Sequence, residues 1–244
     1  MSTLFADDVM RLALGDIGVG PGGASFTFAE NARLLGAYAW IEQRLFELLG
    51  GWIATEPVPE VRIVFDVHGR QHGWHAQLFA DLVPSVDGSD PADLIKAPGQ
   101  GVVALFAEAA VPSGGWDAHL SGERTHGEQG RSAPGAVPSS SQIIPPARGG
   151  TLLRLVALGR VLTARLVTTY SRHLHHSAPI ADAPVIRALR LVLADEIEAW
   201  RGVEALVQAL AHRHHDLAVC AERQQMLEAL IEPGGVGLVR WPAT

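Results

Sequence analysis

Apolar residues recur every three or four positions over four long stretches of the sequence, which is the spacing of one face of an α-helix. The first stretch predicts a helix over residues 27–49, which Gly50 and Gly51 should end. The second predicts a helix over 59–82, with a proline in its first turn and Pro84 just past its end. Because the connection between these two helices is short, we expect them to pack as antiparallel neighbours.

The same spacing returns in the second half of the chain. It predicts a helix that starts at about residue 150 and ends at 176, then a helix over 182–211 whose first turn Asp182 should cap. The turn between them is again short. The chain therefore consists of two predicted helical hairpins, 27–83 and 151–212, and we expect an all-α protein built as an antiparallel four-helix bundle.

The hairpins are separated by a long crossover, residues 84–150, in which the pattern predicts one short helix over 101–110. Residues 114–150 are rich in Gly, Pro and Ser, a composition typical of a mobile surface loop. A further helix is predicted over 217–231, within a C-terminal segment that spans 213–244. Each hairpin is incomplete alone, so we expect a single domain over residues 1–244.

Composition narrows the class of protein further. Asp and Glu outnumber Lys and Arg, with a formal net charge of -7, and this balance argues against a nucleic-acid partner. The single cysteine, Cys220, excludes an internal disulfide framework and a cysteine-rich zinc module. No apolar run reaches the roughly 20 residues that span a bilayer, and no secretory signal is evident. We expect a soluble cytoplasmic protein with no membrane partner, for which a homodimer is one arrangement.

The helix predicted over 59–82 has unusual polar residues on its apolar face. Steps of three and four from its phenylalanines lead to His68, His72 and His75. An imidazole buried without a partner costs about 1 to 3 kcal/mol, so this stripe needs acids or a metal ion. The same spacing turns Glu42 of the first helix and Glu196 of the fourth toward the bundle interior.

Two phenols, Tyr38 and Tyr170, fall on the same inward faces, and each is expected to bond to a histidine or an acid. The third helix offers no acid on its inward face. A run of histidines at 173, 175 and 176 lies at the predicted end of that helix, where a partly charged imidazole suits the helix dipole. No functional site is predicted from that run.

The order of the helices, the long crossover and the acid and histidine cluster resemble the ferritin-like superfamily, which includes di-iron carboxylate proteins. Members with two irons carry Glu on helices one and three and Glu-x-x-His on helices two and four. Glu42 matches the first position. His72 stands where a Glu is expected, with His75 three residues later, whereas Glu196 is followed by Ala199 at the histidine position. The resemblance implies a ferritin-like topology and oxidative chemistry.

Two inward acids are too few to balance two irons, so we expect either one ion of iron, manganese or zinc or a bundle that has lost its metal. The candidate ligands are Glu42, His68, His72, His75 and Glu196, and the candidate catalytic residue is Tyr170.

Three other interpretations of this cluster stay open. The first is a polar seam that acids and buried water satisfy, the second is acid and base catalysis without metal, and the third is a metal-dependent bundle of the DinB-like kind. The functional hypothesis is a metal-dependent oxidoreductase that acts on a small-molecule substrate. Its rival is a non-catalytic scaffold or partner-binding protein without a metal.

Overall fold

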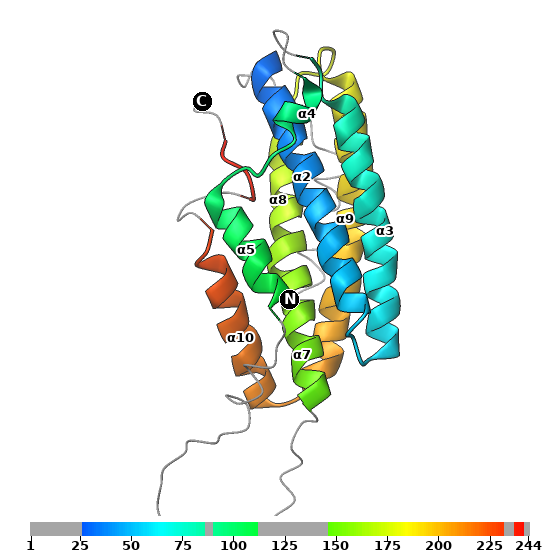
Figure 1. Ribbon diagram of the computed structural model, residues 1–244, viewed down its shortest axis with the longest axis vertical. Helices are drawn as coiled ribbons and strands as arrows, with labels where there is room; N and C mark the ends of the chain where they lie inside the picture. Colours follow the sequence, from blue (N-terminus) through cyan, green and yellow to red (C-terminus); the bar gives the residue numbers. More distant parts are fainter. Residues whose placement is uncertain (1–25, 86–89, 112–145, 232–236, 242–244) are drawn as a thin grey trace, which may run out of the picture.

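The computed structural model describes residues 26–85, 90–111, 146–231 and 237–241, and within these ranges every regular element is a helix. Four long helical segments lie side by side, and we call them the bundle (Figure 1). They are α2 (Phe28–Ile53), α3 (Pro59–Leu82), the continuous segment α7 (Pro146–Leu155), η1 (Val156–Thr163) and α8 (Ala164–His175), and α9 (Ala183–Leu210). The all-α prediction is thus confirmed.

Hydrogen bonds at the two ends of the bundle show how the segments run. Glu56, just after α2, accepts a hydrogen bond from Thr151 near the start of the third segment. At the other end, Asn31 near the start of α2 bonds both His173 of α8 and Asp182 just before α9. The third segment is therefore antiparallel to α2, whereas α9 runs parallel to it.

Since α3 also runs opposite to α2, α3 and the third segment are parallel, and the chain between them must return along the length of the bundle. Two described helices lie on this return, α4 (Pro91–Leu94) and α5 (Gln100–Ala110), beside α2 and α8 (Figure 1). The short helix predicted over 101–110 is confirmed. Residues 114–145 of the predicted mobile loop lie outside the described residues, whereas 146–150 belong to α7, so the third helix begins about four residues earlier than predicted.

The C-terminal helix, α10 (His214–Glu228), packs against α5 and the third segment. Arg223 of α10 is buried and donates to the side chain and the main-chain oxygen of Glu108 in α5. α10 begins three residues earlier than the predicted 217–231 because Asp216 accepts from the main-chain N–H groups of His212 and Arg213. These bonds pair the N–H groups of the N-cap residue and of the residue before it with an acid in the first turn.

Two further predictions at helix ends are wrong. Gly50 and Gly51 do not end the first helix, which continues to Ile53 because Trp52 of its last turn is buried in the core. Asp182 makes no side-chain cap on α9. Its carboxylate instead accepts hydrogen bonds from Asn31 Nδ2 and from the main-chain N–H of Ala178, each at 2.7 Å. In both places tertiary contacts outweigh the local signal.

The third segment contains a π-helical stretch, η1, that the apolar spacing did not predict. A π-helix closes its hydrogen bonds one residue later than an α-helix, which changes the face to which the following residues turn. Within η1, a Cβ added to Gly159 would lie 2.7 Å from Cγ1 of Val203, so only glycine permits this approach of η1 to α9. The stretch ends seven residues before Tyr170 and helps to set its direction.

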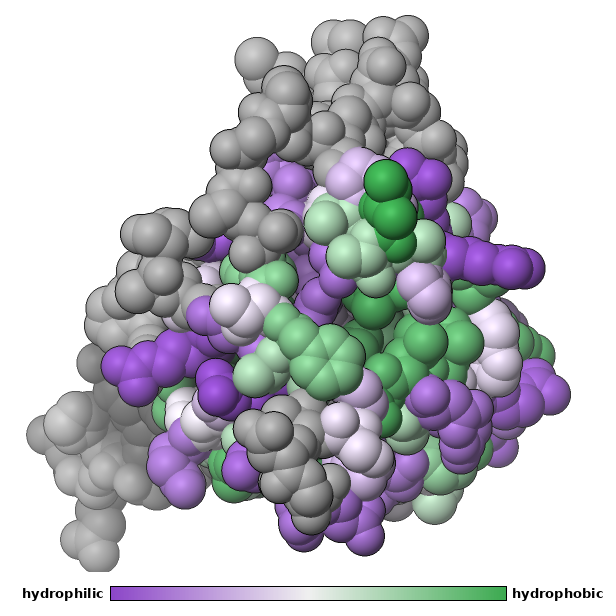
Figure 2. Space-filling model, turned by 90° about the horizontal axis from the view of Figure 1, so that it is seen from above, coloured by the Kyte–Doolittle hydropathy of each residue, from purple (hydrophilic) through white to green (hydrophobic). Residues whose placement is uncertain are grey.

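The core fills the space between the four long segments and contains, among others, Tyr38, Phe65, Phe79, Leu158 and Tyr170. The end of the bundle at which α2 and α9 begin is seen in Figure 2, where apolar side chains gather near the centre and polar ones surround them. Among the described residues, no helix combines the length and the apolar character that a membrane crossing requires.

Candidate metal centre

Four buried side chains from three helices meet near the middle of the bundle. They are Glu42 of α2, His72 and His75 of α3, and Glu196 of α9, and each is at most 1% exposed. Each offers one nitrogen or oxygen atom, and these four atoms lie within 4.8 Å of one another. All four residues are on apolar helix faces, so folding of the core brings them together.

The measured distances between these groups suit a single ion. His72 Nδ1 lies 2.6 Å from Glu42 Oε2 and 3.3 Å from Glu196 Oε1, and His75 Nδ1 lies 3.6 and 3.3 Å from the same two oxygens. A tetrahedral site with ligands about 2.0 to 2.1 Å from the metal has edges of about 3.3 to 3.4 Å. Three of the four distances are close to that value, and the fourth is a short hydrogen bond.

Some buried polar atoms of the cluster have no hydrogen-bond partner. Within the described part of the chain, His72 Nε2, His75 Nδ1 and Glu196 Oε2 are buried without a hydrogen-bond partner. A native core pairs nearly all of its buried polar atoms, and each unpaired one costs about 1 to 3 kcal/mol. Of the three atoms, His75 Nδ1 still lies within ion-pair distance of Glu42 and Glu196, so His72 Nε2 and Glu196 Oε2 are the two that are left for a partner outside the cluster.

A fifth residue, Asp195 of α9, fixes the orientation of His75. Its Oδ2 lies 3.1 Å from His75 Nε2, and since a carboxylate only accepts, Nε2 must carry the hydrogen. In the neutral ring the lone pair is then on Nδ1, the atom that faces Glu42 and Glu196. A carboxylate that orients a histidine in this way is a common outer partner of metal ligands. About a third of the Asp195 side chain is exposed.

Burial and pairing compete in setting the charges of the cluster. Burial opposes ionisation of Glu42, but His72 and His75 outweigh it and lower its pKa to about 2. Burial likewise opposes a charge on His75, yet Glu196 and Glu42 raise its pKa to about 11. The pKa of His72 is also raised, by the same two acids against its burial. Burial is the main cause that raises the pKa of Glu196. Protonated histidines thus balance carboxylates in this core, and protons must leave them before they bind a metal.

Tyr170 of α8 donates a hydrogen bond from its hydroxyl group to Glu42 Oε1, the oxygen that does not face His72. The phenol is fully buried, and burial together with the nearby acid raises its pKa well above the usual value. The hydroxyl group therefore stays protonated and holds the carboxylate of Glu42 in place. The expected bonding of both inward phenols is confirmed, because Tyr38 contacts a histidine, His173.

His68, the remaining candidate ligand, is not part of this group. It is half buried, and its Nδ1 lies 3.1 Å from Gln71 Oε1 on the same helix. Rotation about the axis of α3 does not explain this difference, because at about 100° per residue His68 points between the directions of His72 and His75. His68 instead lies one turn, about 6 Å, before His72 along the helix.

His173, which the sequence assigned to an exposed helix end, is fully buried. Burial, with a smaller contribution from His176, lowers its pKa to about 3, so the ring is neutral. The helix does end two residues later, at His175, but His173 turns toward α2 and lies among Phe26, Tyr38 and Asn31. The signal in the sequence that indicates this burial is the spacing of three residues between Tyr170 and His173, which places both on one face of the helix.

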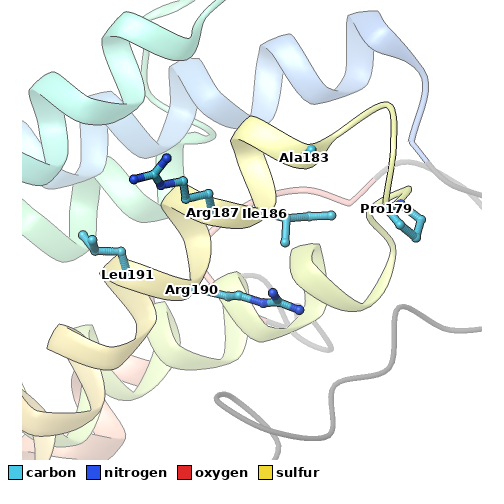
Figure 3. A pocket seen from close by; sticks show the side chains of 6 residues that line it. All are labelled: Pro179, Ala183, Ile186, Arg187, Arg190 and Leu191. Atoms are coloured by element: carbon cyan, nitrogen blue, oxygen red, sulfur yellow. The ribbon is translucent and has the colours of Figure 1, made fainter.

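An open pocket of about 470 Å³ lies on the surface where α9 begins (Figure 3). The side chains that line it are Pro179, Ala183, Ile186, Arg187, Arg190 and Leu191. None of them belongs to the cluster at mid-bundle. This pocket therefore says nothing about what reaches the candidate metal centre.

Chemically, the cluster offers two imidazole nitrogens and two carboxylates, which suit zinc, iron or manganese. A second ion has little support, because the described third segment, residues 146–175, contains no Asp or Glu to bridge it.

No protein-family model, curated protein or solved structure matches the chain.

Proposed function

We propose that this chain is a ferritin-like bundle that binds one divalent metal ion through Glu42, His72, His75 and Glu196 and uses it in oxidative chemistry. The observation that carries the proposal is the convergence of four buried ligand atoms, with buried polar atoms around them that lack partners. The parallel course of α3 and the third segment, joined by a long crossover, supports the ferritin-like part of the proposal.

The charge of the cluster favours one ion over two. Two carboxylates neutralise one divalent cation, whereas two cations would leave an uncompensated charge in a core that water does not reach. A divalent cation that displaces two histidine protons leaves the net charge of the site unchanged. Binding should therefore release protons and become tighter as the pH rises.

The oxidative part of the proposal rests on the ligand set and on Tyr170. Two histidines and a carboxylate form the set associated with mononuclear non-haem iron, which supplies redox chemistry when bound. Tyr170, through its hydrogen bond to Glu42 Oε1, is the proposed catalytic residue of the pocket. It keeps Glu42 oriented and provides a proton next to the site. A small molecule is the proposed substrate.

A second candidate function is a non-catalytic scaffold in which the cluster is a polar core. The hydrogen bond of 2.6 Å between His72 Nδ1 and Glu42 Oε2 favours it, because this pair satisfies itself without any ion. The unpaired Glu196 Oε2 argues against it.

Metal analysis of protein purified without a histidine tag separates the two functions. We expect one iron, manganese or zinc ion per chain, and we expect it to be lost in the His72→Ala, His75→Ala double variant. A matched control is His214→Ala, His215→Ala, which changes two exposed histidines of α10 and should keep the metal. A metal-free protein whose unfolding temperature does not change on addition of metal would support the scaffold.

The oxidative step has its own test. Protein loaded with Fe²⁺ should consume dioxygen faster than the double variant at the same iron concentration, whereas Zn²⁺-loaded protein should consume none. Metal binding without oxygen uptake would support the proposed metal centre and contradict the proposed oxidoreductase function.

A further inference from the structure

A series of buried, hydrogen-bonded side chains begins at Tyr38, beside Tyr170, and leads away from the candidate metal centre. Tyr38 Oη lies 3.1 Å from His173 Nδ1, and His173 Nε2 lies 2.6 Å from Asn31 Oδ1. Asn31 Nδ2 then donates to Asp182 Oδ1 at 2.7 Å. All four side chains are buried, and the chain of bonds links α2, α8 and the turn before α9.

The directions of these hydrogen bonds follow from the end at Asp182. The carboxylate accepts, so the amide nitrogen of Asn31 donates to it and the amide oxygen faces His173. His173 Nε2 must therefore carry a hydrogen, and a neutral imidazole then has its lone pair on Nδ1. That lone pair accepts the hydrogen of the Tyr38 hydroxyl group. The surrounding structure thus fixes one tautomer of His173 and one direction for the phenol.

Tyr38 is connected to the candidate metal centre through its aromatic contact with Tyr170. Its ring lies edge to face against Tyr170, with ring centroids 5.0 Å apart, and Tyr170 bonds Glu42. Such a separation is van der Waals contact between rings. An electron can pass between the two phenols without any movement of the backbone.

We propose that Tyr38 and His173 form a proton-coupled redox pair. When a one-electron oxidant removes an electron from Tyr38, the O–H bond of the phenol breaks and its proton moves to His173 Nδ1. The products are a neutral tyrosyl radical and an imidazolium ion, and the electron is on the reduced oxidant. Return of one electron and the same proton restores the starting state.

The surroundings of His173 suit this role. Burial keeps the pKa of His173 at about 3, so the ring is neutral and free to accept, while oxidation makes the phenol a strong acid. The proton has nowhere else to go, because the next group is the amide of Asn31, which is already bonded on both sides. Full burial of Tyr38 keeps the radical away from solvent.

The pair itself needs no metal, whereas its use by the metal centre rests on the function proposed above. A redox-active metal ion held by Glu42 and its neighbours would then be the oxidant, and the electron would reach it from Tyr38 by way of Tyr170. Tyr170 donates to a metal ligand, so a cation there makes Tyr170 the harder phenol to oxidise. Tyr38, one ring further from the ion, is the more stable place for the radical.

The experiment uses the metal-free full-length chain, so its failure is separate from a failure to bind metal. A laser flash in the presence of a ruthenium tris-bipyridine complex and persulfate supplies the one-electron oxidant, and rapid freezing with electron paramagnetic resonance detects the radical. The chain has two tyrosines, Tyr38 and Tyr170, which makes the assignment direct. We expect a long-lived tyrosyl signal in Tyr170→Phe, where Tyr38 is the remaining tyrosine, and its loss when Tyr38→Phe is added.

His173 is tested by two further measurements. In unsubstituted protein, replacing ¹⁴N by ¹⁵N in histidine should change the nitrogen coupling of the radical signal, which is informative even if a variant fails to fold. His173→Gln should shorten the lifetime of the signal and remove this coupling, while circular dichroism checks that the helices remain. The absence of a tyrosyl signal in Tyr170→Phe, or a signal from tryptophan alone, would overturn the proposal.

Discussion

Two buried carboxylate sites of this protein, one at the end of the bundle and one in its middle, solve the same physical problem in different ways. Glu56, just after α2, is 1% exposed, and both of its oxygens have donors. Its Oε1 accepts from Thr151 Oγ1 at 2.5 Å and from Val58 N at 3.1 Å, and its Oε2 accepts from Arg154 at 3.0 Å. This ion pair is complete within the chain.

The mid-bundle site is incomplete by comparison. Glu196 is equally buried, yet its Oε2 has no described partner, and the positive charge near it comes from histidines whose protons exchange. A permanently charged arginine pairs with Glu56, whereas titratable imidazoles pair with Glu42 and Glu196. The end of the bundle is thus closed by a permanent ion pair, whereas the middle has a buried, titratable group that could hold a metal ion.

The sharpest test of this contrast is Glu196→Gln. The substitution keeps the shape of the side chain and removes its charge, so metal affinity should fall by more than about a hundredfold, beyond the cost of losing an outer partner. Stability of the metal-free protein should fall by less than about 2 kcal/mol, because His72 and His75 can each release a proton when the carboxylate charge beside them is lost, whereas an arginine cannot. Calorimetric titration with Zn²⁺ and urea unfolding measure the two quantities. A large loss of metal-free stability would contradict the contrast.

The same substitution at the other site, Glu56→Gln, should have the opposite profile. It leaves Arg154 without its ion-pair partner and so should lower the free energy of unfolding by about 2 kcal/mol, somewhat less than for a fully buried pair because Arg154 is partly exposed. Metal affinity should stay unchanged. Urea unfolding of the metal-free protein measures the first effect, and an equal fall in metal affinity would argue that the two sites are coupled.

A smaller effect is expected from Asp195→Asn. The amide still accepts from His75 Nε2 but carries no charge, so metal affinity should fall by about tenfold, the lower end for an outer partner of a ligand. Glu198→Gln, an exposed change on the same helix, is the matched control and should have no effect. If both variants bind metal as the unsubstituted protein does, Asp195 does not orient His75.

The smallest effect on the stability of the metal-free protein is expected from a change in pH. The pKa of His75 rises from 6.5 to about 11 on folding, so the stability that its proton contributes is complete below 6.5 and is lost as the pH rises toward 11. The pKa of Glu42 falls from 4.5 to about 2, so its contribution is complete above 4.5 and is lost as the pH falls toward 2. For these two groups the metal-free protein should therefore be most stable between 4.5 and 6.5.

Thermal unfolding of protein treated with a chelator, followed from pH 6.5 to 9, measures the alkaline part of this prediction. The unfolding temperature should fall over this range in the unsubstituted protein. The His72→Ala, His75→Ala variant should show a smaller fall, and identical curves would mean that these histidines are not protonated in the metal-free core.

Helical periodicity predicted the four long segments and the inward faces of Glu42, His72, His75 and Glu196 because each of these inferences depends on residues within a few turns. It failed for His68, which shares the helix face of His72 and His75 but lies about 6 Å before His72 along α3. It also failed for His173, because the polar composition of the residues around it resembles that of a solvent-exposed helix end. Neighbouring helices decide burial there, and one helix does not contain that information.

By itself, the sequence determined that this chain is helical, which helices are hairpin partners, and that histidines and acids share the apolar faces. Only the tertiary structure decided that four of these groups come within 4.8 Å of one another and that three of their atoms stay unpaired. It also decided the π-helical stretch and the chain from Tyr38 to Asp182. The physical reason is that periodicity specifies a direction from one helix axis, whereas a binding site requires the separations between several axes, and packing sets those.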